Sequence, residues 1–309
     1  MVFRDINNSV IPISAGAHER RSGLQWLQWL LGAAVLAAVI VIALRWTEAR
    51  EIAAMVNRVQ PMWFVLAAAL QLSTYVVQGA FWRALARRLT FALSRRQAFR
   101  LSLAKLFIDQ ALPAAGVSGA VAVAAVLERR GMDHGGVLAG VFVNTSAYFL
   151  AYVICLAVAV PLVPLHGAAR SALWIAASLF VIASTVLAVA VLVLPTHAPP
   201  AWLAHLAKRR LFSRSIRLIH EVDHPLVRDR TLLTEATVYQ ALIVLLDAAT
   251  MWSLVKGLGT NATIASVFGC FMVSNLFRTL GILPGGLGTF EATSVLTLQA
   301  IGVPVPVAL

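Results

Sequence analysis

The chain has 309 residues, 60% of them hydrophobic and 12% charged, with a formal net charge of +12. An ordinary soluble domain carries about 25% charged residues, so this composition excludes that class and indicates a polytopic, all-α membrane protein. In a soluble protein the positive charge would suggest nucleic-acid binding. Here most Lys and Arg residues fall in short segments between apolar runs, where membrane orientation and anionic lipid explain them better, and we expect no nucleic-acid partner.

The first part of the chain contains two predicted spans. Residues 1–23 form a polar N-terminal segment, and the apolar run 24–44 is long enough to cross a hydrocarbon core of about 30 Å. Because this run is longer than the core of a signal peptide, we expect a retained first span and no cleaved leader. A second span is predicted from about Pro61 to Trp82.

An arginine-rich segment, residues 83–100, leads into an apolar run at 101–127 that is interrupted around Pro113 and Gly116. Proline removes a backbone donor and glycine favours non-helical conformations, so we expect the helix to break there. Lys105 and Asp109 precede the break by a few residues. Their spacing of four predicts that they are neighbours on one helix face.

The second part of the chain repeats this kind of pattern. Spans are predicted at 136–160, 171–194 and 232–255, with a basic polar loop at 195–231. A last apolar element, 264–303, is broken near its centre and carries charge inside the apolar run. Its unusual residues are Arg278, Pro284, Gly285, Gly286, Gly288 and Glu291. A break in hydrocarbon survives only when it is buried in protein or lines a wet cavity.

The distribution of Lys and Arg predicts how the first broken run lies in the membrane. If 101–127 crosses straight through, the two sides receive 11 and 12 loop Lys and Arg residues, which is no bias. If it turns back, the cytoplasmic side receives 18 and the outer side 5. The positive-inside rule favours the second arrangement. We therefore expect 101–127 to be re-entrant from the cytoplasm, 264–303 to be re-entrant from outside, and the N-terminus to be cytoplasmic.

This order predicts two inverted membrane repeats, residues 24–160 and 161–309. Leu112-Pro113-x-x-Gly116 and Leu283-Pro284-x-x-Leu287-Gly288 occupy corresponding places in the two halves. Paired interruptions of this kind point to a transport site near the bilayer midplane. A counterpart of the span 136–160 is expected after residue 303, whereas the sequence ends at Leu309. The second repeat thus lacks its last helix, and whether the chain is complete or truncated stays open.

The residues from Pro284 to Ala292, Pro-Gly-Gly-Leu-Gly-Thr-Phe-Glu-Ala, closely resemble the signature of the flippase-like membrane family. That family includes the membrane flippase region of lysylphosphatidylglycerol synthases. The resemblance implies movement of a polar-headed lipid, anionic or aminoacylated, between leaflets of a bacterial plasma membrane. Bifunctional relatives carry an aminoacyl-transferase domain after the membrane part. No such segment is present in this sequence, so we expect no enzymatic activity and no cofactor.

Lys105 and four other charged residues in apolar runs are candidate lipid-binding residues, because charge inside a bilayer is costly. The prolines and glycines of the two breaks are candidates with them: Pro113, Gly116, Pro284, Gly285, Gly286 and Gly288. Arg278 could hold a lipid phosphate or form a structural ion pair with Glu291 or Asp247. Glu291 could bind a proton or a headgroup amine, or only compensate the dipole of a helix that begins near Thr289. Asp109 and Asp247 complete the set. For Asn144, Gln240 and Asn275 we predict interhelical hydrogen bonding.

One motif suggests a different class of protein. His220-Glu221-Val222-Asp223-His224 matches the H-E-x-x-H pattern of zinc proteases. Pro225 disfavours helical conformation at His224, and no convincing third ligand follows, so His220 and His224 are weak metal candidates.

We therefore predict a lipid flippase whose partners are membrane phospholipids. A second copy of the chain or a lipid-modifying enzyme is the compatible protein partner. The main rival is an accessory protein that binds lipid and transports nothing. The zinc protease is a minor alternative.

Overall fold

The computed structural model describes residues 60–111, 117–163, 167–193, 221–280 and 288–308, and within these ranges the regular structure is entirely helical. Four of the described helices are long and apolar enough to cross a membrane: α3 (Pro61–Arg88), α6 (His134–Ala159), α7 (Gly167–Val193) and α11 (Arg230–Gly257). They confirm the spans predicted from the sequence between residues 61 and 255. The predicted span 24–44 lies outside the described residues.

Four further helices are too short to cross alone. They are α4 (Arg95–Ala111), α5 (Val117–Arg129), α12 (Ile264–Leu280) and α13 (Thr289–Ala300). At 1.5 Å per residue, the longest of them reaches only about 26 Å. Single turns occur at η2 (Val160–Leu162), α10 (His224–Val227) and α14 (Val305–Ala308).

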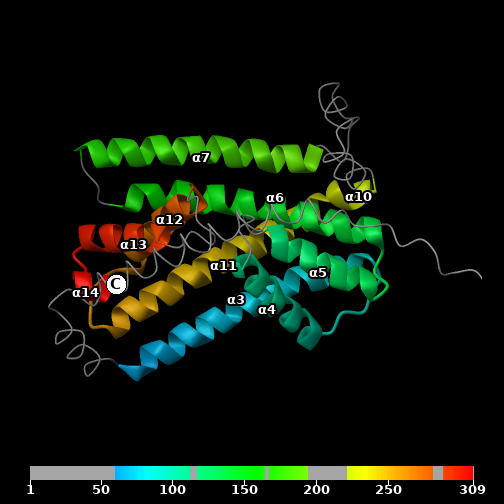
Figure 1. The fold of residues 1–309 in the computed structure, drawn as a ribbon, viewed down its shortest axis with the longest axis horizontal. Helices are drawn as coiled ribbons and strands as arrows, with labels where there is room; N and C mark the ends of the chain where they lie inside the picture. Colours follow the sequence, from blue (N-terminus) through cyan, green and yellow to red (C-terminus); the bar gives the residue numbers. More distant parts are fainter. Residues whose placement is uncertain (1–59, 112–116, 164–166, 194–220, 281–287, 309) are drawn as a thin grey trace, which may run out of the picture.

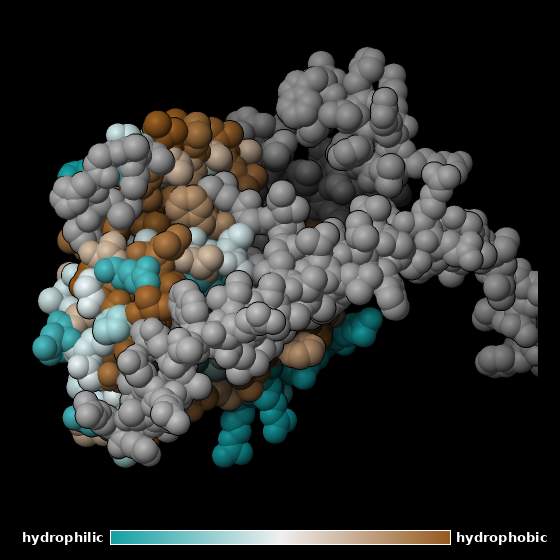
Figure 2. All heavy atoms as spheres, turned by 60° about the vertical axis from the view of Figure 1, so that its left-hand side comes forward, coloured by the Kyte–Doolittle hydropathy of each residue, from teal (hydrophilic) through white to brown (hydrophobic). Residues whose placement is uncertain are grey.

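The long helices form a bundle in which α11 packs against both α3 and α6, while α7 lies beyond α6 (Figure 1). One face of α7 is more than half exposed along its length, at Ile175, Leu179, Ile182 and Val186. Figure 2 shows apolar atoms gathered at the top of the view, the side on which α7 lies in Figure 1. An exposed apolar stripe on a helix of this length is the surface expected to face lipid.

The two pairs of short helices pack at opposite ends of the bundle (Figure 1). A buried cluster joins α4 and α5 to the end of α3 and the beginning of α6, through Leu93, Leu127 and Met132. A second cluster joins α12 and α13 to the end of α11, through Val267, Leu298 and Val255. The beginning of α4 and the end of α5 therefore lie together at one end. The beginning of α12 and the end of α13 lie together at the other.

Aspartates fix three helix starts at the first of these ends. Asp133 accepts a hydrogen bond from the Gly136 amide at 2.8 Å and caps α6, and Asp223 caps α10 through the Leu226 amide. Asp229 caps α11 by accepting from the amides of Thr231 and Leu232. Each carboxylate satisfies donors that the first helical turn leaves unpaired.

The arginine-rich segment 83–100 is mostly helical, which differs from the prediction of a loop between spans. α3 continues six residues past Trp82, and α4 begins at Arg95. The extension is stable because Arg88 has partners on α11. Its guanidinium donates to Asp229 at 2.9 Å and to Glu235 at 3.0 Å. Cations in the last turn also complement the negative end of the helix dipole.

Asp229 supports a prediction about stability. Hydrogen bonds from the Thr231 hydroxyl, the Leu232 amide and Arg88 lower the pKa of Asp229 to about 2. Asp229→Ala should lower the free energy of unfolding at pH 7 by about 1 kcal/mol, because the cap of α11 is lost. Asp229→Asn should keep the cap and lose only the attraction to Arg88.

The pH dependence distinguishes the two effects. The unfolded carboxyl titrates near pH 3.9, so the stabilisation is complete above about pH 4 and is lost as the pH falls toward 2. Chemical unfolding in detergent should show a steeper acid loss for the wild type than for Asp229→Asn. Identical acid profiles of the two proteins would contradict the assignment.

Candidate functional site

Polar side chains form two layers inside the apolar bundle. In the first layer, the amide oxygen of Asn144 on α6 accepts from Gln240 on α11 at 2.9 Å and from Gln78 on α3 at 3.5 Å. Asn144 and Gln240 are both buried. This confirms the interhelical bonding predicted for these two residues. Asn275, in contrast, donates to the Phe271 carbonyl of its own helix α12.

The second layer lies farther along the same three helices and contains a charge. Gln71 on α3 donates to the carboxylate of Asp247 on α11 at 3.4 Å and contacts the hydroxyl of Thr74 at 3.5 Å. Residues 71, 74 and 78 lie on one face of α3, and 240 and 247 lie on one face of α11. The polar positions therefore follow one another along the interface of these helices, and we call this line of residues the polar track.

Tyr148 on α6, one turn after Asn144, interacts electrostatically with charged residues on three other helices. The charges that act on its hydroxyl are those of Arg278 on α12, Asp109 on α4 and Asp247 on α11. The charge of Arg278 also acts on Asp247 and on Tyr152. Helices from both halves of the sequence thus contribute charges that act on one partly buried tyrosine. We call these residues (Asp109, Tyr148, Asp247 and Arg278) the Tyr148 cluster.

The first broken pair of helices is held together by Asp109. One oxygen of its carboxylate accepts from the Gly119 amide at 2.7 Å and from the Ser118 hydroxyl at 3.3 Å, at the start of α5. The other oxygen pairs with Lys105 at 2.8 Å, as the spacing of four predicted. The approach is close enough that a Cβ at position 119 would collide with the Lys105 carbonyl, so glycine is required there.

In the second broken pair, α12–α13, a carboxylate also caps the second helix, but here it belongs to that helix itself. Glu291, in the first turn of α13, accepts from the Gly288 amide at 2.6 Å. Glu291 is exposed, and its place in the first turn agrees with the predicted alternative that it compensates the helix dipole, while its predicted role toward a lipid stays a prediction. α13 begins at Thr289, as expected. Pro113, Gly116, Pro284, Gly285 and Gly286 lie outside the described residues.

The described residues of the H-E-x-x-H match make structural contacts. Glu221 pairs with His134 at 3.0 Å, and Asp223 caps α10. His224 is exposed and opens α10, ahead of Pro225. Among the described residues, no group of three or more His, Cys, Asp or Glu side chains could hold a metal ion. His220 lies outside them, so the pair itself is untested.

Sequence reasoning found the charged members of the cluster but not its centre. Gln71, Gln78 and Tyr148 received no role, although each interrupts an apolar face at helical spacing. Tyr148 follows Asn144 by four residues and precedes Tyr152 by four, which puts all three on one face of α6. This spacing of four residues is the feature of the sequence that indicates a polar face on α6.

The fold and this buried polar track define a class of protein: a multi-pass helical membrane protein with charged groups inside the bundle. A family model described as the lysylphosphatidylglycerol synthase TM region matches residues 29–309. The chain therefore belongs to that family, as the resemblance of its Pro284–Ala292 motif indicated. A comparison with curated proteins finds no match.

The Lys105–Asp109 pair can be tested by a double-mutant cycle. Both side chains are only 13% exposed, so each single change leaves a poorly solvated partner. Asp109→Asn and Lys105→Met should each destabilise the protein, while the double variant should lose less than the sum by about 1–3 kcal/mol. The measurement is the unfolding free energy in mixed micelles. Strict additivity would mean that the pair contributes nothing.

Proposed function

We propose that this chain moves a polar-headed phospholipid, anionic or aminoacylated, between the leaflets of a bacterial plasma membrane. The observation that carries the proposal is the Tyr148 cluster, in which charged residues on three helices, from both halves of the sequence, all act electrostatically on one side chain of the bundle. A charge at the bilayer centre costs about 2.5–3.5 kcal/mol on insertion scales, which favours a functional reason for keeping it.

In this proposal the headgroup follows the polar track and the acyl chains stay in lipid. Arg278 binds the phosphate, because a guanidinium forms paired hydrogen bonds with phosphate oxygens. Asp109 and Asp247 receive the amine of an aminoacylated headgroup or balance Arg278 while the track is empty. Tyr148 lies between them and can donate to a phosphate or accept from an amine.

The opposed short helices give the track its two entrances. We infer that α4–α5 is re-entrant from the cytoplasm and α12–α13 from outside, in two inverted repeats. This is supported by the packing of residues near Leu89 against the beginning of α6, where the Leu89 side chain fills the space beside Gly136. The two ends of the α4–α5 pair thus share one end of the bundle. The family of the chain supports a lipid as the substrate class.

The transport proposal is tested by transfer of a headgroup-labelled lipid in vesicles that contain the purified protein. Arg278→Ala should fold and lower the initial rate at least tenfold, since one charge-assisted pair contributes about 1.5–3 kcal/mol. Arg278→Lys should retain part of the rate. The control is Arg130→Ala, on the exposed turn after α5. Wild-type vesicles that transfer no more lipid than empty ones would favour the accessory, non-transporting protein.

The re-entrant arrangement is tested separately by labelling introduced cysteines from each side of the membrane. Single cysteines at Thr90 and Gly131, which lie in the turns after α3 and α5, should react from the same, cytoplasmic side. Reaction from opposite sides would mean that α4 and α5 cross the membrane as one span.

A further inference from the structure

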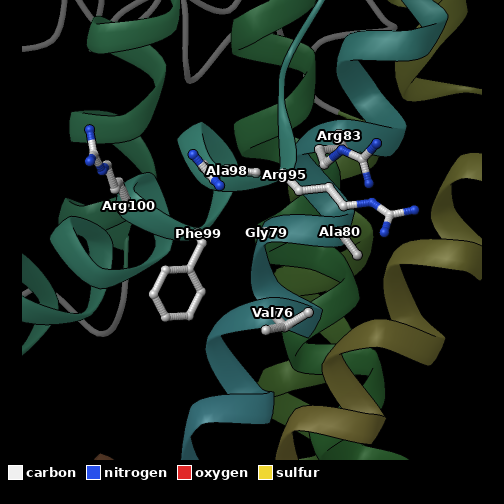
Figure 3. Close-up of a pocket in the computed structure, with 9 residues that line it drawn as sticks. Val76, Gly79, Ala80, Arg83, Arg95, Ala98, Phe99 and Arg100 are labelled. Atoms are coloured by element: carbon white, nitrogen blue, oxygen red, sulfur yellow. The ribbon is translucent and has the colours of Figure 1, made fainter.

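A cavity of about 610 Å³ lies outside the Tyr148 cluster, between the last turns of α3 and the first turns of α4 (Figure 3). This volume is in the usual range for a small-molecule site. Four of the lining residues are arginines and the others are small or apolar. The lining consists of Val76, Gly79, Ala80, Arg83, Arg95, Arg96, Ala98, Phe99 and Arg100.

The local sequence explains why the cavity forms. Ser94 and Gln97 cap the start of α4 reciprocally, which fixes its first turn. At Gly79, α3 packs closely against the backbone of Ala98. A Cβ at position 79 would lie only 3.2 Å from the Ala98 carbonyl group. The short side chain of Ala80 then leaves space beside this contact. Tyr75 and Phe99 close it with an edge-to-face contact at 6.3 Å.

In the part of the chain that the structure describes, no carboxylate pairs with the arginines of the cavity. Arg83 donates to the Leu93 carbonyl at 3.3 Å. Throughout the described ranges, none of the four lining arginines forms a salt bridge, unlike Arg88 close by. Figure 3 shows the Arg83 and Arg95 side chains extending toward the same side of α3. Neighbouring guanidinium groups repel one another, so a bound anion would stabilise them, and phosphate fits their geometry best.

The apolar part of the cavity indicates what carries the phosphate. Val76 is 59% exposed, and Leu72, one turn farther along α3, is 53% exposed. The helix rise puts Val76 about 10 Å from Arg83 along the axis. A free phosphate would contact only the arginines and leave this apolar wall uncovered. A phospholipid matches both parts, because it has a phosphate at one end and an acyl chain at the other.

We propose that this cavity is a binding site for an anionic phospholipid of the leaflet next to the basic loops. Arg83 and Arg95 bind the phosphodiester, Arg96 and Arg100 add positive charge at the entrance, and an acyl chain lies along Val76 and Leu72. Binding at equilibrium requires no movement between leaflets. Lipid binding in this cavity is therefore separate from lipid translocation and does not depend on it.

The test is native mass spectrometry of the full chain in detergent, titrated with phosphatidylglycerol or with phosphatidylcholine of the same acyl chains. The wild type should bind the first phosphatidylglycerol at least tenfold more tightly than phosphatidylcholine. Arg83→Gln with Arg95→Gln should remove that preference. The matched control, Arg129→Gln with Arg130→Gln, removes the same charge from the exposed end of α5 and the turn after it, and should change the preference less than twofold.

Two further arms keep the result decisive. Ala80→Phe fills the cavity without changing any charge and should weaken the first lipid at least fivefold, even if the double arginine variant folds poorly. Glycerol 3-phosphate in millimolar excess should not displace phosphatidylglycerol from the wild type. Equal losses in both double variants, unchanged binding in Ala80→Phe, or displacement by glycerol 3-phosphate would each overturn the site.

Discussion

The amides in the first turn of a helix have no partner within that helix, and the two pairs of short helices depend on how this requirement is met. At the start of α5 the requirement is met by Asp109, which accepts from the amide of Gly119. At the start of α13 it is met by Glu291, which accepts from the amide of Gly288. A carboxylate therefore stabilises each half-helix that follows a break, but the first comes from the preceding helix and the second from the helix itself.

This difference separates two carboxylates that look alike in sequence. Because Asp109 reaches across its break, it is drawn between the helices, pairs with Lys105 and contributes to the field at Tyr148. Glu291 caps its own helix from an exposed position. Glu291 caps its own helix, whereas Asp109 combines a structural bond with membership of the charged cluster.

Two separate positively charged regions result from the same packing. Arg278 brings charge into the bundle, where Asp247 and Asp109 lie nearby. The arginines that line the α3–α4 cavity lie at the end of the bundle. At the same end, Arg88 forms salt bridges with Asp229 and Glu235. The pairs formed by Arg88 hold α3 to α11, and among the described residues no such pair is formed by the arginines that line the cavity.

The sequence by itself determined the membrane class, the long spans between residues 61 and 255, the places of the two interruptions, and the Lys105–Asp109 contact. These follow from local properties: hydropathy over a span length, proline and glycine chemistry, and helical spacing. Only the tertiary structure decided that the charges of Asp109, Asp247 and Arg278 all act on Tyr148. It also decided that Gln71 and Gln78 belong to the polar track and that Arg83 and Arg95 share a cavity. Those residues are brought together by packing between distant helices, and no local pattern encodes which face of one helix will meet another.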